Sequence, residues 1–424
     1  MKKFLMAALF AALSGIARAV EITVLALPAF SPTNTLPAIA GAYANAVKEF
    51  EKANPGVTVK YEYLPAYNEA LRAIRARVAT GNLPDVLVLD AGWLPIMHEL
   101  RTVRPLDTLW TPEERSRLFP DTVKGVTFDG KPYGVWIYNS YRGFFYRPSE
   151  MSALGFKQPP ETWNDFMKLG EAAKAKGKFL TLLPGGPKVE TVSHMLSVFW
   201  GLGGELVDDG GRPVLGEGRN RAALERTYAL YRELVDRQFM PSIVANYDET
   251  PTRPFFYSGE SLTTGQSTSL LQQMFADQPA LKGDLGVFPF PLPDGARSVP
   301  VLSGFVYSIT TRQDAKVAPA WSFIRHMVDP AVLGPVNAVQ GHIPVQFPIW
   351  NQPFFANDPL MVQVKEAWEK AGLKIVPNVP YYPEIVRIMS EQMPGVLTGR
   401  LTPAKAAENV GEQVMAAYRR STGR

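Results

Sequence analysis

The sequence contains no cysteine among its 424 residues. This absence excludes a catalytic thiol, a cysteine-ligated zinc site and any disulfide bridge. Histidine is scarce, and the four that are present stand apart from one another: His98, His194, His326 and His342. Because none of them forms the H-x-H or H-x-x-x-H spacing of a zinc hydrolase, we predict that the protein holds no metal and uses no cofactor.

Signatures of nucleophilic and nucleotide chemistry are also missing. There is no G-x-S-x-G turn, no phosphate-binding P-loop and no G-x-G-x-x-G after a strand, and the glycine-rich pieces at 201–204 and 210–211 read as turns. Carboxylates are plentiful, but no pair has a distinctive spacing for glycoside hydrolysis. We predict a protein that is not an enzyme and has no catalytic residues. A secreted glycoside hydrolase is the alternative from another class.

The N-terminus has the three-part pattern of an export signal. Lys2 and Lys3 give a positive start, residues 4–13 form an apolar stretch, and small residues around Arg18 form a cleavage site. The apolar stretch is too short to span a membrane as a helix, and no cysteine follows it to carry a lipid. We therefore predict a signal peptide at 1–19 and a mature protein that is soluble, periplasmic and not a lipoprotein.

The charge of the chain gives no sign of a polyanionic partner. The formal net charge is +4, from 44 basic and 40 acidic residues, and three of the basic residues lie in the predicted signal peptide. A nearly neutral mature chain does not favour nucleic acid or an anionic membrane as a partner. No later run of about 18 apolar residues predicts a transmembrane helix, and we expect a monomer.

Strand and helix patterns alternate near the start of the chain. The spacing predicts a strand, a helix, a strand, a helix and a strand at 21–27, 42–52, 57–63, 71–80 and 85–90. This alternation is typical of an α/β fold with a mainly parallel sheet. Further helices are predicted at 162–176, 219–237 and 403–420. Because roughly 400 residues are too many for one ordinary core, we predict two lobes, joined without a flexible linker.

Residues 133–146 are rich in aromatic side chains. Because the side chains of a strand alternate between its two faces, these rings cannot all enter one core. Aromatic faces in a cleft suit a ligand that has flat apolar patches and hydroxyl edges. The alternative is that most of the rings simply pack the interior.

Five short phrases occur in order along the chain: 50–57 (FEKANPGV), 79–86 (ATGNLPDV), 160–163 (PETW), 256–260 (FYSGE) and 341–344 (GHIP). Together they resemble the extracellular solute-binding proteins of ABC importers, in the large sugar-binding family (family 1). The aromatic segment resembles the first crossing between the lobes of that family. The resemblance implies a carbohydrate ligand, delivery to the transmembrane permease subunits of an ABC importer, and no chemistry on the ligand.

The same resemblance implies a two-lobed periplasmic-binding-protein fold, whose lobes are discontinuous in sequence and close on the ligand about a hinge. Lobe 1 is predicted to comprise 20–134 and 262–312. Lobe 2 is predicted to comprise 135–261 and 313–424.

Three further phrases resemble the branch of this family that binds glycerol 3-phosphate: 138–140 (YNS), 263–270 (TTGQSTSL) and 398–403 (TGRLTP). By this match, Trp200 is an aromatic floor of the cleft, and the residues that line it are Asp90, Ser140, Ser267 or Ser269, Gly304 and His342. The sequence departs from the branch twice, with His342 in place of a tyrosine and Val386 in place of a phosphate-binding arginine. Arg387 is one residue away, about 100° around a helix.

We therefore favour a neutral carbohydrate, and keep glycerol 3-phosphate or a glycerophosphodiester as the alternative ligand. A site that lacks an arginine able to form bidentate hydrogen bonds recognises a buried phosphate poorly. An arginine turned into the cleft, either Arg142 or Arg147, would favour the phosphate ester.

Roles for the site residues follow from their position and chemistry. Asp90 ends a strand, where open α/β sheets place ligands, and a carboxylate there can accept two hydroxyl hydrogen bonds. Gly304 would let the backbone approach the ligand closely. The tryptophans expected to stack on sugar rings, unless they pack a core, are Trp93, Trp136 and Trp200. The other residues expected near the ligand, unless they form plain turns or core, are Tyr67, Asn68, Tyr138, Ser140 and Ser269.

Overall fold

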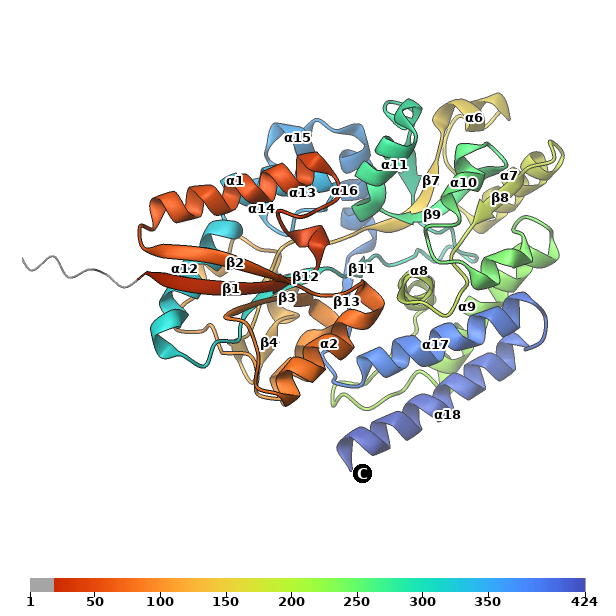
Figure 1. The fold of residues 1–424 in the computed structure, drawn as a ribbon. Helices are drawn as coiled ribbons and strands as arrows, with labels where there is room; N and C mark the ends of the chain where they lie inside the picture. The colour runs from red at the N-terminus through yellow and green to blue at the C-terminus, as the bar shows by residue number, and fades with distance from the viewer. Residues whose placement is uncertain (1–18, 424) are drawn as a thin grey trace, which may run out of the picture.

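The computed structural model describes residues 19–423 and shows two α/β lobes side by side, each built on its own sheet (Figure 1). The predicted fold class is confirmed. The predicted signal peptide at 1–19 lies outside the described residues, apart from Ala19.

Lobe 1 is built on a five-stranded sheet in the order β2-β1-β3-β12-β6. Its strands are β1 (Val20–Ala26), β2 (Val57–Tyr63), β3 (Val86–Asp90), β6 (Val135–Trp136) and β12 (Phe305–Ile309). β1 is parallel to β2 and β3, whereas β12 runs antiparallel to both β3 and β6. Short parallel strands separated by helices are what the alternating pattern of the sequence predicted.

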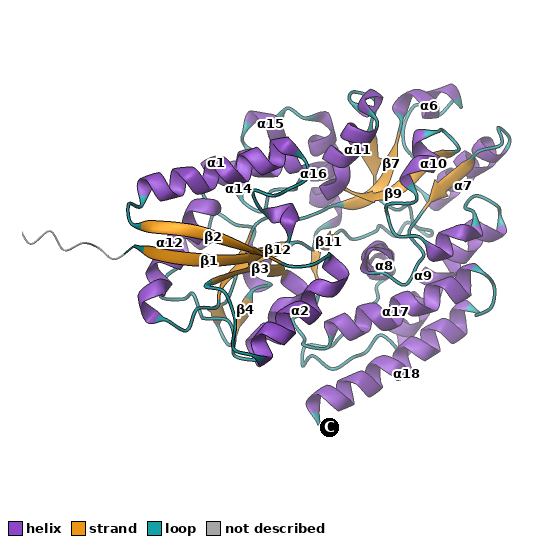
Figure 2. Cartoon of the chain, viewed as in Figure 1, coloured by secondary structure: helices purple, strands orange, loops and turns teal. Residues whose placement is uncertain are grey.

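Helices cover both faces of the lobe 1 sheet (Figure 2). They are α1 (Pro37–Ala53), α2 (Tyr67–Ala79), α12 (Asp314–Met327) and α13 (Pro330–Gln340). Each helix turns an apolar stripe inward, as Tyr43, Ala46 and Phe50 do on α1, where all three are buried. The helices predicted at 42–52 and 71–80 therefore exist and begin earlier than predicted.

Lobe 2 is built on a four-stranded sheet in the order β10-β7-β9-β8. Its strands are β7 (Arg142–Tyr146), β8 (Phe179–Leu182), β9 (Ser261–Ser267) and β10 (Gly286–Phe288). The large helices packed in this lobe are α7 (Trp163–Lys174), α8 (Val189–Gly201), α9 (Gly218–Asp236), α17 (Tyr382–Leu397) and α18 (Pro403–Thr422). Thr162 and Thr402 cap α7 and α18 through their side chains, as N-terminal threonines are expected to do.

Three segments of chain cross between the lobes. Residues 137–141 join β6 to β7, residues 289–304 return from β10 to β12, and residues 372–381 lead from α16 (Pro359–Ala371) to α17. The second and third crossings pair with each other through the parallel strands β11 (Val301–Leu302) and β13 (Lys374–Ile375). Backbone hydrogen bonds tie the first crossing to the second and to the start of β12: Ser140 N donates to the Ser303 carbonyl at 3.0 Å, and Ile137 N donates to the Phe305 carbonyl at 2.9 Å.

The lobe boundaries differ from the prediction in three places. Residues 135–136, which we assigned to lobe 2, form β6 in the lobe 1 sheet. β10 and all of β9 but its first residue lie within 262–312, which we assigned to lobe 1, but both strands are hydrogen-bonded into the lobe 2 sheet. α12 and α13 begin the segment 313–424, which we assigned to lobe 2, but Trp321 and Ile324 are buried in the lobe 1 core. Periodicity predicts where a strand or helix lies and does not tell which of two sheets it joins.

Short elements complete the chain. The helices are α3 (Leu94–Glu99), α4 (Pro112–Arg115), α5 (Pro120–Lys124), α6 (Pro148–Ala153), α10 (Arg253–Tyr257), α11 (Leu271–Asp277), α14 (Phe347–Trp350) and α15 (Pro353–Ala356), with 3-10 turns at η1 (Pro28–Phe30), η2 (Ala91–Trp93), η3 (Ser242–Asn246), η4 (Thr268–Leu270) and η5 (Pro279–Leu281). β4 (Thr127–Phe128) and β5 (Lys131–Pro132) form a hairpin. Within residues 19–423, no helix has the length and apolar character needed to cross a membrane.

Gly304 allows the first two crossings to lie this close together. A Cβ atom at residue 304 would sit 2.1 Å from the carbonyl oxygen of Tyr138, which cannot rotate away as a side chain could. We expect Gly304→Ala to lower the free energy of unfolding in urea by about 1–3 kcal/mol, the usual cost of overpacking. Gly41→Ala is the control. Its Cβ would meet no heavy atom within 4 Å, so a helical alanine should stabilise by up to about 1 kcal/mol. Equal stability of the two variants would contradict this account.

Candidate functional site

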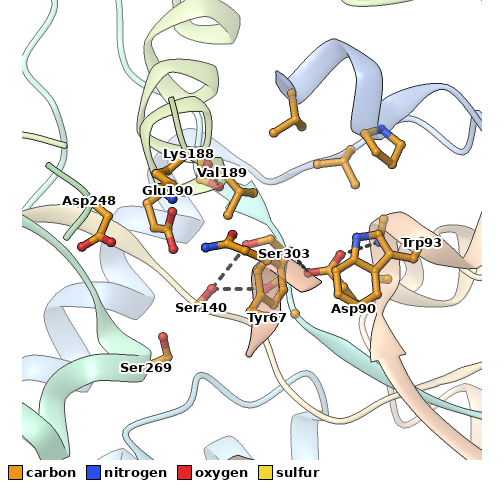
Figure 3. Close-up of a pocket in the computed structure, with 18 of the residues that line it drawn as sticks. Tyr67, Asp90, Trp93, Ser140, Lys188, Val189, Glu190, Asp248, Ser269 and Ser303 are labelled. Carbon is orange, nitrogen blue, oxygen red and sulfur yellow. Dashed lines mark hydrogen bonds between the residues drawn. The ribbon is translucent and has the colours of Figure 1, made fainter. Parts of the chain in front are cut away.

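A cavity of about 520 Å³ lies between the two lobes. This is within the range of small-molecule sites in proteins. Lobe 1 supplies the end of β3, the start of β12 and the start of α2. Lobe 2 supplies the start of β7, the N-terminal ends of α8 and α17, and a loop at 248–250. Figure 3 shows Tyr67, Asp90 and Trp93 on one side of the cavity, facing Glu190 and Asp248 on the other.

Asp90 stands at the carboxyl end of β3 and caps η2. Its Oδ1 accepts a hydrogen bond from the Gly92 N–H at 2.8 Å, and its Oδ2 accepts one from the Tyr67 hydroxyl at 2.9 Å. Burial raises the pKa of Asp90 to about 6, although both hydrogen bonds and the positive charge of Arg142 oppose the rise. The carboxylate is therefore fixed in direction, and it changes charge not far below neutral pH.

Aromatic rings form the lobe 1 wall of the cavity. Tyr67 lies against Trp93, with ring centroids 5.0 Å apart, and Phe305 packs edge-on to both. Tyr138 stacks on His342 at 3.6 Å with nearly parallel planes. Burial lowers the pKa of His342 to about 3, so that its ring is neutral at neutral pH. The wall is thus an apolar, π-rich surface next to a fixed carboxylate.

Arg142 is part of the lobe 2 wall. Its Nε donates to Glu249 Oε1 at 3.2 Å, and its Nη1 donates to Ser140 Oγ and Ser303 Oγ at 3.3 and 3.1 Å. Glu249 also pairs with His194 Nε2 at 3.0 Å. Burial alone would raise the pKa of Glu249, but the charge of Arg142 and the contact with His194 outweigh it and lower the pKa. Glu249 is therefore a buried, ionised partner for the guanidinium.

Two further carboxylates border the cavity on lobe 2. Burial and the neighbouring charge of Glu249 raise the pKa of Glu190, which stands in the first turn of α8. Asp248 accepts a hydrogen bond from the Thr250 N–H at 2.8 Å. Lys188 precedes α8 and also borders the cavity. In the part of the chain that the structure describes, these groups do not form a cluster that could hold a metal ion.

Both Val386 and Arg387 on α17 border the cavity. The resemblance puts only the position of Val386 toward the ligand, with Arg387 about 100° away around the helix. Arg387 is 48% exposed and forms ion pairs with Glu384 and Glu391 at 2.9 and 2.7 Å. Its charge is therefore balanced on the surface of its own helix.

The structure brings seven of the predicted site residues to this cavity: Tyr67, Asp90, Trp93, Tyr138, Ser140, Ser269 and Gly304. Asn68 borders it as well. The aromatic segment therefore divides, because Tyr138 reaches the cavity, whereas Phe144 and Tyr146 pack in the lobe 2 core.

Four predicted residues do not line the cavity. Trp136 is fully buried in the lobe 1 core. Trp200 is no floor of the cleft, because it packs in the lobe 2 core with the ammonium of Lys374 over its ring at 5.4 Å. His342 stands behind Tyr138. Ser267 is 1% exposed and caps η4 by accepting from the Ser269 N–H. His342 and Ser267 therefore support two residues that border the cavity, Tyr138 and Ser269.

Sequence reasoning missed much of the lobe 2 wall, namely Lys188, Val189, Glu190, Ser193, Asp248, Glu249, Thr250, Tyr382 and also Ser303 and Phe305. Glu190 could have been found, because it opens the helix after β8 just as Asp90 ends β3, and ligands gather beyond strand ends. The loop at 248–250 has no sequence pattern that marks it.

Comparisons with known proteins agree with this architecture. A family model described as bacterial extracellular solute-binding protein matches residues 33–333. A putative binding protein of Brucella abortus is 24% identical over 368 residues, which cover 86% of each chain. An uncharacterized ABC transporter extracellular-binding protein of Pyrococcus horikoshii is 24% identical over 262 residues, which cover 59% of this chain and 57% of that one.

Two solved structures superpose over nearly the whole chain. The maltose-bound MalE3 of T. maritima has a TM-score of 0.79 at 21% identity, covering 93% of this chain and 99% of that one. The sugar-binding protein MalE of Xanthomonas citri has a TM-score of 0.79 at 22% identity, covering 95% of this chain and 98% of that one. At these identities, the likeness shows a shared two-lobed fold.

The hydroxyl of Tyr67 holds down the pKa of Asp90, so its removal should raise that pKa above the value of about 6. We expect an NMR titration of the aspartate carboxyl carbons to show this rise in Tyr67→Phe. Tyr63→Phe is the matched control, since Tyr63 is 42% exposed and does not border the cavity, and it should leave the pKa of Asp90 unchanged. A pKa of Asp90 that stays the same or falls in Tyr67→Phe would refute the assigned hydrogen bond.

Proposed function

The chain belongs to the family of bacterial extracellular solute-binding proteins, and we propose that it binds a neutral carbohydrate between its lobes and delivers it to the permease of an ABC importer. The observation that carries the proposal is the pairing of a fixed carboxylate with an aromatic wall in one cavity. A sugar ring has an apolar face that packs on aromatic rings and a rim of hydroxyls that donate to a carboxylate.

The named relatives support this choice of ligand class. The two structures with the same fold are a maltose-bound protein and a sugar-binding protein. The relative from Pyrococcus horikoshii is named for an ABC transporter. Family members and structural neighbours are binding proteins, which fits a chain without a catalytic motif. We propose that the product of this gene acts outside the cytoplasm as a monomer, and that hinge closure presents the loaded form to the permease.

The charges around the cavity favour a neutral ligand over a glycerol phosphate ester. Arg142 does turn toward the cavity, while Arg147 turns away and pairs with Glu150. However, the positive charge of Arg142 is already matched by Glu249. Two more carboxylates, Glu190 and Asp248, would repel a phosphate at the lobe 2 wall. A phosphate would therefore meet a guanidinium already paired with Glu249 and two acidic side chains, which leaves Lys188 to offset the cost of its desolvation.

Native mass spectrometry of the purified protein tests the ligand class directly. We expect a bound mass that matches an oligosaccharide or monosaccharide, and calorimetric binding of that sugar after it has been removed and added back. We expect a calorimetric heat of binding with neutral saccharides, and none with glycerol 3-phosphate or glycerophosphodiesters. Binding of the phosphate esters alone would overturn the proposed ligand class, and release of a hydrolysed product from a glycoside would support the hydrolase instead.

Binding should weaken in acid because Asp90 titrates with a pKa of about 6. Protonation removes the negative charge that accepts hydroxyl hydrogen bonds, so affinity should fall as the pH drops from 7.5 to 5. Asp90→Asn should bind at least tenfold more weakly at pH 7.5 and lose most of this pH dependence. Asp129→Asn is the control, because Asp129 is 87% exposed and does not border the cavity. Calorimetry that finds the same pH profile in wild type and Asp90→Asn would remove Asp90 from the site.

A further inference from the structure

Arg142 is a buried cation that the prediction of the site left undecided. It is the first residue of β7, directly after the first crossing between the lobes, and its side chain is only 14% exposed. The side chain also lines the cavity between the lobes. A buried guanidinium is costly unless each of its donors has a use.

One edge of the guanidinium is anchored inside lobe 2. Nε donates to Glu249 Oε1, and the same oxygen is held by His194 Nε2. Glu249 and His194 are each about 5% exposed. Burial lowers the pKa of His194, so that a neutral imidazole braces the carboxylate. This anchor fixes the plane of the guanidinium before any ligand arrives.

A second donor joins the two crossings. Nη1 donates to Ser140 Oγ on the first crossing and to Ser303 Oγ on the second. The two serines are themselves bonded, with Ser140 N donating to the Ser303 carbonyl at 3.0 Å. Arg142 therefore occupies a fixed place relative to both hinge segments.

The last donor, Nη2, has no acceptor among the described residues. Across the cavity stands Asp90, whose pKa responds to the charge of Arg142, as do those of Tyr138 and Tyr382 on the cavity wall. A ligand oxygen between the two lobes would thus meet an acceptor on lobe 1 and a donor on lobe 2. A hydroxyl group can donate to one and accept from the other at once.

We infer that Arg142 contacts the ligand on the lobe 2 side through Nη2 and recognises an oxygen acceptor of the saccharide, with Glu249 as the residue that positions it. This inference rests on the proposed function, because it needs a ligand rich in hydroxyl groups. It adds a specificity-determining residue that none of the sequence phrases marked.

The test compares the same substitution at Arg142, the first residue of β7, and at Arg147, the residue that follows this strand. Arg142→Lys keeps the charge but loses the planar, forked arrangement of donors, and we expect at least tenfold weaker calorimetric binding of the saccharide that native mass spectrometry identifies. Arg147→Lys is the control, because Arg147 donates to the Phe256 carbonyl and pairs with Glu150, away from the cavity. It should bind as the wild type does. Equal affinity in Arg142→Lys and wild type overturns the inference.

Glu249 is tested by a double-mutant cycle. If Glu249 acts through Arg142, Glu249→Gln weakens binding in the wild-type background and adds no further loss in Arg142→Lys. Losses that simply add would show that Glu249 acts independently and would overturn its positioning role. Urea unfolding of each variant confirms that the binding losses are measured on folded protein.

An NMR titration of the wild-type protein tests the contact without any substitution. Addition of the saccharide should shift the NMR signals of the Arg142 guanidinium protons and leave those of Arg147 in place. Unshifted Arg142 signals in a saturated complex overturn the inference while leaving the proposed function intact. A wild-type protein that binds no saccharide of the panel overturns the proposed function and the inference with it.

Discussion

The close pairing of the first two crossings is the constraint on which the rest of the structure depends. Ile137 and Ser140 bond to the backbone at Phe305 and Ser303, and the absence of a side chain at Gly304 lets the Tyr138 carbonyl approach. This pairing sets β6 beside β12 and starts β7 in the other lobe. Because β12 also pairs with β3, the same contact brings the end of β3, and hence Asp90, to the junction between the lobes.

The local structure could be predicted from the sequence, because it depends on neighbouring residues. The alternating pattern at 57–63 predicted β2 at its observed bounds, and the helix predicted at 403–420 begins at the expected residue, directly after its Thr402 cap. The assignment of strands to sheets could not be predicted in the same way. β9 joins lobe 2 because its backbone pairs with β7 and β8, and that choice among sheets depends on contacts far apart along the chain.

The candidate site was predictable to the extent that general rules place residues beyond the ends of strands. The family resemblance placed Asp90 in the cleft, and that rule agrees with its position at the end of β3. A matched phrase fixes the position of a residue and not the direction of its side chain, which is why Trp136 and Trp200 were assigned to a cavity and instead fill two cores. His342 and Ser267 lie one layer behind the wall, where a residue supports Tyr138 or Ser269 without reaching the cavity.

The buried charged groups of the lobe 2 wall lower the stability of the fold, and their position at the cavity suggests why they are present. Burying Arg142 with Glu249 gains little for the fold, because the desolvation of two ions offsets most of their attraction. Glu190 adds a carboxylate whose Oε2 is buried without a hydrogen-bond partner among the described residues. A fold under selection for stability alone would replace such groups with apolar ones. Their concentration at one cavity, opposite a carboxylate of raised pKa, is the pattern expected where polar groups are held ready for a ligand.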